Sequence, residues 1–247
     1  MPNACAQIAT FNCEWRRPAS RDAKLIRQRV LESDVEVACL TETHERFFED
    51  YGHSVTSAPF DTGIHPQSRR KVLLWSQRPW RNVRVAGPDC SPPGPHIAAT
   101  TDTSIGELTF VGIIIPYRWA GVKSKPALAK TWELHLRFLT VLDHWLPSPL
   151  ERTVILGDFN QRIPRKYQPV QVFDELDRVL LRRFKIATAG VVPTIGRQAI
   201  DHICHTDDLV SGPVMGISNL RADGGEISDH FGVRTTLSGA DEDNGRG

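Results

Sequence analysis

Residues 153–160 read TVILGDFN, a run of β-branched and aliphatic residues that ends in a glycine and two polar side chains around a phenylalanine. Such a run is typical of a buried strand that passes into a tight turn. Asp158 and Asn160 stand two residues apart across that turn, so both side chains could point at one water molecule. Alone, the run fits equally well a strand-to-helix turn in which the aspartate only caps the helix.

Polar side chains stand at or just beyond other strand-like runs as well. In chain order they are Asn12, Glu42, Asp201 and the pair Asp229-His230. Scaffolds that combine helices and sheets gather catalytic groups from distant parts of the chain at the ends of strands. One carboxylate in such a place carries little weight, but the ordered set predicts a catalytic site.

The length and composition favour one globular domain. With 247 residues, of which 40% are hydrophobic, the chain can bury a substantial core. We assign residues 1–238 to one catalytic domain, treat residues 88–95 as a loop, and expect the polar, glycine-rich tail 239–247 to be disordered. The net charge of +1 neither requires nor excludes a polyanionic partner.

The spacing of apolar residues predicts a strand-rich chain with few helices. Strands are expected at residues 7–12, 35–41, 71–76, 83–86, 107–115, 153–156, 199–204, 214–220 and 231–237. Helices are expected at residues 21–32, 126–146 and 170–184. This element order predicts an α+β fold rather than an all-parallel sheet. The expected architecture is a four-layer α/β/β/α sandwich, in which helices flank two packed mixed β-sheets.

Short motifs in a fixed order resemble the endonuclease/exonuclease/phosphatase superfamily, which includes abasic-site endonucleases and pancreatic-type deoxyribonucleases. The motifs are TFN ending at Asn12, LTET around Glu42, GDFN ending at Asn160, IDHI with Asp201, and SDH ending at His230. The resemblance spans residues 7–237. It implies a metal-dependent phosphodiester hydrolase and pairs Asp201 with His230.

The chemistry of phosphodiester hydrolysis explains these residue types independently. The phosphate anion repels an incoming hydroxide, so an enzyme must neutralise charge and place a water in line. Mg²⁺, with Mn²⁺ as an alternative, prefers oxygen ligands and often uses only one or two protein carboxylates. We therefore expect Glu42 and Asp229 at the cation, with Asn12 holding Glu42 or a bound water. Either Asp158 or His230 could act as the general base.

One position departs from the pattern of the two named subfamilies. Ile114 stands where abasic-site endonucleases carry a tyrosine and pancreatic-type deoxyribonucleases a histidine, so their leaving-group helper is missing there. Tyr117 or Arg118, just past the following proline, could reach the same space. His202, next to Asp201, is expected to face the opposite side of its strand, in the core.

Three segments expected at the rim of the site mix aromatic and basic side chains. They supply the substrate-binding candidates Arg16, Tyr117, Arg118, Trp119 and Arg165. Cationic side chains bind phosphates and aromatic rings stack on bases, so the mixture favours a flexible or single-stranded nucleic acid and predicts a nuclease. One alternative is a phosphatase or phosphodiesterase for a small-molecule or lipid phosphoester, which the near-neutral charge favours. Another is a non-catalytic pseudoenzyme that only binds nucleic acid.

The remaining features concern the cellular context. The N-terminus lacks a basic segment followed by a sustained apolar stretch, and no apolar run approaches 18 residues. We therefore expect a cytoplasmic protein with no membrane partner, and no obligate protein partner is evident. The chain has five cysteines, and those near strand-like runs lack zinc-ligand spacing, so we expect reduced core thiols at Cys13, Cys39 and Cys204.

Overall fold

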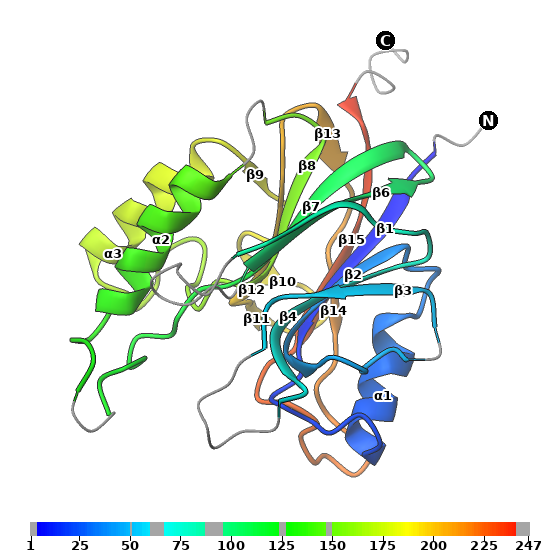
Figure 1. The fold of residues 1–247 in the computed structure, drawn as a ribbon, viewed down its shortest axis with the longest axis horizontal. Helices are drawn as coiled ribbons and strands as arrows, with labels where there is room; N and C mark the ends of the chain where they lie inside the picture. The colour runs from blue at the N-terminus through cyan, green and yellow to red at the C-terminus, as the bar shows by residue number, and fades with distance from the viewer. Residues whose placement is uncertain are drawn as a thin grey trace.

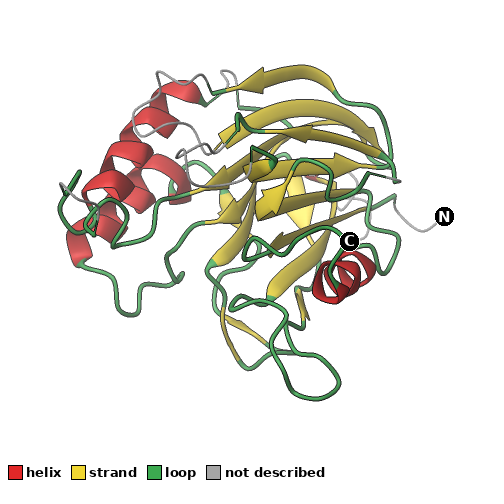
Figure 2. Ribbon diagram, turned by 60° about the horizontal axis from the view of Figure 1, so that its bottom comes forward, coloured by secondary structure: helices red, strands yellow, loops and turns green. Residues whose placement is uncertain are grey.

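The computed structural model describes residues 4–49, 51–59, 67–86, 96–123, 127–146 and 150–240. Two β-sheets pack face to face, and helices cover the outer face of each (Figure 1). Figure 2 shows the arrangement from another side, with the strands between helices that lie at opposite flanks. The predicted α+β sandwich of four layers is therefore confirmed.

The first sheet has seven strands in the order β13-β15-β1-β2-β4-β3, and β14 also pairs with β15. Its strands are β1 (Ala6–Asn12), β2 (Val37–His44), β3 (His53–Thr56), β4 (Arg69–Ser76), β13 (Leu209–Ser211), β14 (Met215–Ile217) and β15 (Gly232–Gly239). β1 runs parallel to β2 and antiparallel to β15. The first and last strands of the described chain therefore lie side by side.

The second sheet has six strands in the order β5-β6-β7-β8-β12-β9. Its strands are β5 (Arg81–Val85), β6 (His96–Thr103), β7 (Gly106–Ile114), β8 (Thr153–Asp158), β9 (Lys185–Ile186) and β12 (Asp201–His205). β8 is parallel to β7 and antiparallel to β12. A separate two-stranded ribbon consists of β10 (Val191–Val192) and β11 (Arg197–Gln198).

Helix α1 (Arg21–Val30) covers the first sheet. Ser20 caps its N-terminus, because the Ser20 Oγ accepts a hydrogen bond from the N–H of Ala23 at 3.1 Å. Ala23, Ile26 and Val30 form its buried face, at the three- and four-residue spacing of an amphipathic helix. The helix therefore closes the core on the outer side of the first sheet.

The second sheet is covered by α2 (Glu133–Trp145), by α3 (Val170–Leu176) and by the π-helical turn η1 (Asp177–Leu181). Phe138, Leu139 and Leu142 are the fully buried apolar residues of α2 in this core. In the described part of the chain, no helix is long and apolar enough to cross a membrane.

Alternate residues of β2 enter different cores. Val37 and Cys39 pack between the two sheets, whereas Ala38 and Leu40 pack under α1. The strand is therefore buried on both faces, which explains why its sequence is a continuous apolar run without polar alternation.

The two sheets come into direct contact around Gly112 of β7. A Cβ at this position would stand 2.7 Å from Val72 Cγ1 and 2.9 Å from Leu74 Cδ2, both on β4. Glycine therefore sets the local spacing between the sheets, because close-packed cores leave no room for an added carbon. The predicted core thiols are confirmed as buried free cysteines at Cys13, Cys39 and Cys204.

Several predicted boundaries differ from the structure. The second helix begins at Glu133, because Trp132 before it has a left-handed backbone with φ of 67°, and its N–H donates to the Arg118 carbonyl oxygen. The strands β3 and β6 were not predicted, since their threonines and histidines interrupt the apolar pattern. The predicted strand at 214–220 shortens to β14. Residue 126, the loop 88–95 and residues 241–247 lie outside the described residues.

Candidate active site

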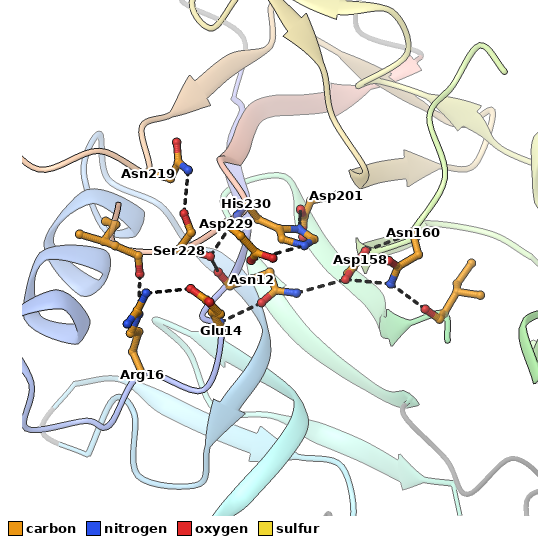
Figure 3. A network of polar contacts seen from close by, with 12 residues as sticks. Asn12, Glu14, Arg16, Asp158, Asn160, Asp201, Asn219, Ser228, Asp229 and His230 are labelled. Carbon is orange, nitrogen blue, oxygen red and sulfur yellow. Dashed lines mark hydrogen bonds and ion pairs between the residues drawn. The ribbon is translucent and has the colours of Figure 1, made fainter. Parts of the chain in front are cut away.

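The predicted catalytic side chains meet at one edge of the sandwich (Figure 3). β1 and β8 end at this edge, and β15 and β12 begin there, because each of these pairs is antiparallel. Asp201, the first residue of β12, stands directly opposite Asp158, the last residue of β8. From the other sheet, Asn12 Nδ2 donates a hydrogen bond to Asp158 Oδ2 at 3.1 Å. Both sheets therefore contribute to one polar site.

Asp158 is buried and accepts three hydrogen bonds. Asn12 Nδ2 and Asn160 Nδ2 each lie 3.1 Å from its Oδ2, and the Asn160 N–H donates to its Oδ1 at 2.8 Å. Gly157 has φ of +134°, and a Cβ there would collide with the carbonyl oxygen of Ile113. The turn therefore requires glycine to place the carboxylate. Burial raises the pKa of Asp158 to about 8.

His230 is paired with Asp201, at the position that the resemblance implied. The His230 Nδ1 lies 2.7 Å from Asp201 Oδ2, as a donor, and Asp229 Oδ1 lies 3.8 Å from its Nε2. Burial opposes a charge on the imidazole, but Asp201 and Asp158 outweigh this effect and raise the pKa of His230 to about 10. The shift favours the protonated, positively charged form of His230.

Glu42 occupies an irregular point of β2. Its φ of +46° is uncommon for a residue with a side chain, and the pairing of β2 with β4 skips it. Burial raises the pKa of Glu42, while the charges of His230 and Lys71 lower it. Burial in turn lowers the pKa of Lys71, and Glu42 counteracts that shift. Backbone strain of this kind clusters at functional sites.

These side chains line a cavity of about 460 Å³, which we call the first hollow. It brings together all of the predicted catalytic and metal-binding residues except Asp201, namely Asn12, Glu42, Asp158, Asn160, Asp229 and His230. Ile114 contributes an apolar wall, and Tyr117 lines the same hollow from the following loop with its side chain half exposed. Of the two predicted substitutes for the missing leaving-group helper, Tyr117 is therefore the one beside Ile114.

The donor atoms of the site suit a hard divalent cation. Within the described residues, ligand atoms of Asp158, Asp201 and His230 all lie within 4.8 Å of one another. The Oδ1 atom of Asp201 is buried and has no hydrogen-bond partner in that part of the chain. The carboxylates of Glu42 and Asp229 face the first hollow beside this cluster. A set dominated by carboxylate oxygens fits Mg²⁺ or Mn²⁺ better than a soft metal.

The side-chain amide of Asn12 bonds Asp158 and the backbone of Glu14. Its Nδ2 donates to Asp158, and its Oδ1 accepts the N–H of Glu14 at 2.9 Å. The prediction that Asn12 holds Glu42 or a bound water stays a prediction, because its NH2 group has a second hydrogen and its oxygen a second lone pair. Its place among the cation ligands stays a prediction.

Two of the predicted substrate-binding arginines already have partners within the protein. Arg16 Nε donates to the Ile227 carbonyl oxygen at 2.9 Å, and its Nη2 bonds Glu14 Oε2 at 2.8 Å (Figure 3). Arg165 is exposed, and its Nη1 donates to the carbonyl oxygen of Gln168 at 3.0 Å. Their part in substrate binding stays a prediction, and the geometry favours a role in holding their own loops.

The loop after β7 presents the other three candidates to solvent. Tyr117, Arg118 and Trp119 are all exposed, and the Arg118 guanidinium lies 4.7 Å from the centre of the Trp119 ring. A cation stacked on an aromatic face is held in place while its hydrogen-bond donors remain open. Of the three, Tyr117 lines the first hollow, and the part of all three in substrate binding stays a prediction.

The motifs assign no role to three residues that support the site, which are Ser228, Asn219 and Lys71. Ser228 Oγ donates to the Asn12 carbonyl oxygen at 2.7 Å, and Asn219 Nδ2 donates to the Ser228 carbonyl oxygen at 2.7 Å. Lys71 is the first residue of the strand predicted at residues 71–76, and the sequence pattern gives it no further role. Because β4 runs antiparallel to β2, the start of β4 lies beside Glu42 at the end of β2. That signal requires the strand pairing, which the sequence pattern does not provide.

A buried polar network lies behind the catalytic turn. His135 Nδ1 donates to the Pro116 carbonyl oxygen at 2.8 Å, so its Nε2 accepts from Gln161 Nε2 at 2.8 Å. The same Gln161 amide donates to the Val172 carbonyl oxygen at 3.2 Å. Gln161 directly follows the GDFN turn, and the network therefore links that turn to α2 and α3.

His202 extends this network to β12. Its Nε2 donates to the Gln161 carbonyl oxygen at 3.0 Å, and its Nδ1 accepts from Thr188 Oγ1 at 2.8 Å. Thr188 Oγ1 in turn accepts the N–H of Ile203 at 3.1 Å. The His202 side chain is buried in the core. It lies on the face of β12 opposite to Asp201, as the alternation of side chains along a strand predicts.

Acid should destabilise the protein through these histidines. Burial lowers the pKa of both His135 and His202 to about 4, so between pH 6.5 and 4 the unfolded chain binds protons that the folded chain does not. The free energy of unfolding should therefore decrease as the pH is lowered through this range, by up to about 1.4 kcal/mol per pH unit for each histidine. We expect His202→Asn to show a shallower fall than the parent in urea unfolding at several pH values.

The control for this experiment is His53→Asn, which removes an exposed histidine of β3. It should keep the pH dependence of the parent. Equal slopes for His202→Asn and the parent would show that His202 does not titrate between the two states.

Comparison with known proteins agrees with the motif order. The sequence matches the family model described as the endonuclease/exonuclease/phosphatase family over residues 9–230. No curated protein sequence matches the chain. The family assignment therefore rests on the family model and on the fold.

Solved structures share the whole architecture at low sequence identity. An endonuclease/exonuclease/phosphatase from Bacteroides vulgatus has a TM-score of 0.65 at 14% identity, covering 95% of this chain and 99% of its own. An AP endonuclease from Archaeoglobus fulgidus has a TM-score of 0.63 at 18% identity, covering 93% and 98%. A 3'-5' exonuclease from Neisseria meningitidis has a TM-score of 0.61 at 18% identity, with the same coverage.

The family model covers most of the chain, from β1 to the histidine before β15. Members of the family are hydrolases of phosphoester bonds, and the edge of the sandwich that carries the candidate site is also where the motifs lie. The chain belongs to the endonuclease/exonuclease/phosphatase family.

Proposed function

We propose that this protein is a nuclease that hydrolyses phosphodiester bonds of a flexible or single-stranded nucleic acid with the help of Mg²⁺ or Mn²⁺. One observation carries the proposal: a buried carboxylate with three hydrogen-bond donors, Asp158, stands beside the charged pair of His230 and Asp201. Together they combine a base and a cation at one point, which is what attack on an anionic phosphate requires.

The hydrogen bonds of Asp158 and the charge of the neighbouring His230 favour Asp158 as the general base. His230 is already protonated at neutral pH, because Asp201 accepts from its Nδ1 and stabilises the imidazolium. Its Nε2–H can therefore donate to a phosphate oxygen, and it has no free site to accept a proton. The positive charge of His230 favours the ionised form of Asp158, which is the form that can take a proton from water. Asn12 and Asn160 fix the direction of its oxygens.

A divalent cation would be held by Glu42 and Asp229, whose carboxylates face the first hollow, with Asn12 as the third predicted ligand. When bound, it would neutralise negative charge on the phosphate and its leaving oxygen. Lys71 adds a second positive charge beside Glu42. The apolar side chain of Ile114 cannot donate a proton, so Tyr117 is the candidate that assists the leaving group from the same hollow.

The loop after β7, which contributes Tyr117 to the first hollow, favours a nucleic acid over a smaller ester. Tyr117 and Trp119 expose aromatic surface, and Arg118 lies over the Trp119 ring. Bases stack on such rings whatever their sequence, and arginine binds the backbone phosphates between them. The net charge of +1 favours the alternative, a phosphodiesterase for small phosphoesters, because it supplies little general attraction to a polyanion.

A panel of substrates tests the proposal. In Mg²⁺, single-stranded oligonucleotides should be cleaved faster than duplex DNA or bis(p-nitrophenyl) phosphate. Affinity measured in EDTA should fall with salt, with a log-log slope near −0.7 per contacted phosphate. Arg118→Ala should flatten that slope by about one contact. Trp119→Ala should weaken binding by about 1–3 kcal/mol without changing the slope, because stacking releases no counterions.

Arg137→Ala is the matched control, since Arg137 is an exposed arginine that pairs with Glu133 on α2, away from the hollow. It should leave the slope unchanged. Hydrolysis confined to bis(p-nitrophenyl) phosphate, with salt-independent binding, would favour the small-phosphoester alternative. Tight binding of oligonucleotides with no hydrolysis of any substrate would favour a pseudoenzyme.

A further inference from the structure

A second hollow adjoins the first on the other side of the catalytic histidine. It has a volume of about 370 Å³ and shares Asp229 and His230 with the first hollow. Asp201 lies in its wall, and Phe231, directly after His230, completes that side. A group that occupies the second hollow therefore sits beside the phosphate under attack.

Three cations line this second hollow. Arg162, Lys166 and Arg197 contribute to its wall, and none of them forms an ion pair with a carboxylate of the described residues. Elsewhere, arginines such as Arg81 and Arg178 are bound by two carboxylates each. The charges around the second hollow thus remain available to an anion. Its own acidic residues are limited to the two that it shares with the catalytic site.

Aromatic rings hold these cations in place. The guanidinium of Arg162 lies 5.3 Å from the centre of the Tyr167 ring, and the Lys166 ammonium lies 5.2 Å from it. Arg197 lies 5.1 Å from the centre of the Phe231 ring. Stacking restricts each side chain without using its hydrogen-bond donors, so the donors remain free for a ligand.

The loop that carries Arg162, Lys166 and Tyr167 is built around a buried glutamine. Gln168 Nε2 donates to the Arg162 carbonyl oxygen at 2.6 Å, and Gln168 Oε1 accepts the N–H groups of Tyr167 at 3.2 Å and Lys166 at 3.4 Å. Arg165 binds the Gln168 carbonyl oxygen and closes the loop. The loop therefore has a fixed form before any ligand binds, which reduces the entropy lost on binding.

We infer that the second hollow binds a second phosphate of the substrate, through Arg162 and Arg197, with Lys166 at its edge. This inference rests on the proposed nuclease function and deepens it. The enzyme then reads two successive phosphates of one strand, one at His230 and one in the second hollow. Guanidinium groups match phosphate oxygens with paired donors, which an ester without a second phosphate cannot use.

A neutral linkage within the substrate tests this inference. The probe is a single-stranded oligothymidylate with one uncharged methylphosphonate linkage at its centre, compared with the same strand made entirely of phosphodiesters. Wild-type enzyme in Mg²⁺ should cleave the linkage next to the methylphosphonate, on one side of it, about tenfold more slowly than the same linkage of the control strand. This factor is the typical cost of one charge-assisted contact. The double variant Arg162→Ala/Arg197→Ala should cleave both strands at this linkage at the same slow rate.

Arg137→Ala/Arg182→Ala removes the same charge from exposed arginines that pair with Glu133 and Asp177. It should keep the tenfold difference between the two strands. Equal cleavage of both strands by the wild-type enzyme, or a difference that survives in Arg162→Ala/Arg197→Ala, would overturn the second phosphate site and leave the nuclease function standing. Failure of the wild-type enzyme to cleave any linkage of the control strand would instead overturn the nuclease function, and this inference with it.

Discussion

Replacing Asp158 by asparagine is expected to lower kcat/KM for phosphodiester hydrolysis by about 10²- to 10⁴-fold, the usual contribution of a positioned general base. The substitution keeps the size of the side chain, and the N–H of Asn160 can still donate to its remaining oxygen. It removes the ability to take a proton, and it also replaces the oxygen that accepts from the Nδ2 atoms of Asn12 and Asn160. The loss should appear mainly in kcat, because substrate binding uses other groups.

Asp174→Asn is the matched control, because Asp174 is an exposed carboxylate on α3. It should retain full activity. His230→Ala should cause a loss of similar size to Asp158→Asn, and the double variant should lose far less than the product of the two, because both residues act on one transition state. Activity within about threefold of the parent in folded Asp158→Asn and His230→Ala would show that these residues do not carry the reaction.

Removal of divalent cations should abolish hydrolysis. The carboxylates of Glu42, Asp158 and Asp229 line the first hollow, and the basic side chains among its described lining residues are His230 and Lys71. EDTA followed by gel filtration should therefore reduce the rate to background, and Mg²⁺ or Mn²⁺ should restore it.

Glu42→Gln should raise the Mg²⁺ concentration needed for half-maximal rate by at least about tenfold, since a carboxylate ligand is replaced by a weaker neutral one. Glu45→Gln is its control, because Glu45 lies just beyond β2 and pairs with Arg70. Full activity after EDTA and gel filtration, with no response to added cation, would contradict the metal-dependent mechanism.

Much of the fold could be predicted because the central strands are buried on both faces. The strands β1, β2 and β8 contain apolar runs, and polar residues of the site stand at or near their ends. Strand β6 was not predicted, because its threonines make its sequence polar, although most of these threonines are buried in the structure. Tertiary burial, which pairing decides, overrides the local composition in such a strand.

The motifs predicted which residues make up the candidate site, but not which of them contact one another. The motif order identified Asp158, Asp201 and His230, yet no pattern could show that Asn12 bonds Asp158 across the sheets. Likewise, Lys71 stands beside Glu42 only because β4 pairs with β2 in one register. The second hollow depends on the shape of a loop whose backbone Gln168 holds by hydrogen bonds. Gln168 belongs to no motif, so the sequence did not indicate this role.

The hydrogen bond between Asn12 and Asp158 joins the two halves of the sandwich at the point of chemistry. Asn12 ends a strand of one sheet and Asp158 ends a strand of the other, and the sheets touch around Gly112, farther along β7. The distance between Asn12 Nδ2 and Asp158 Oδ2 therefore depends on how closely the two sheets pack. In the proposed mechanism, an interior substitution that moves the two sheets apart would lower activity without changing any polar residue of the site.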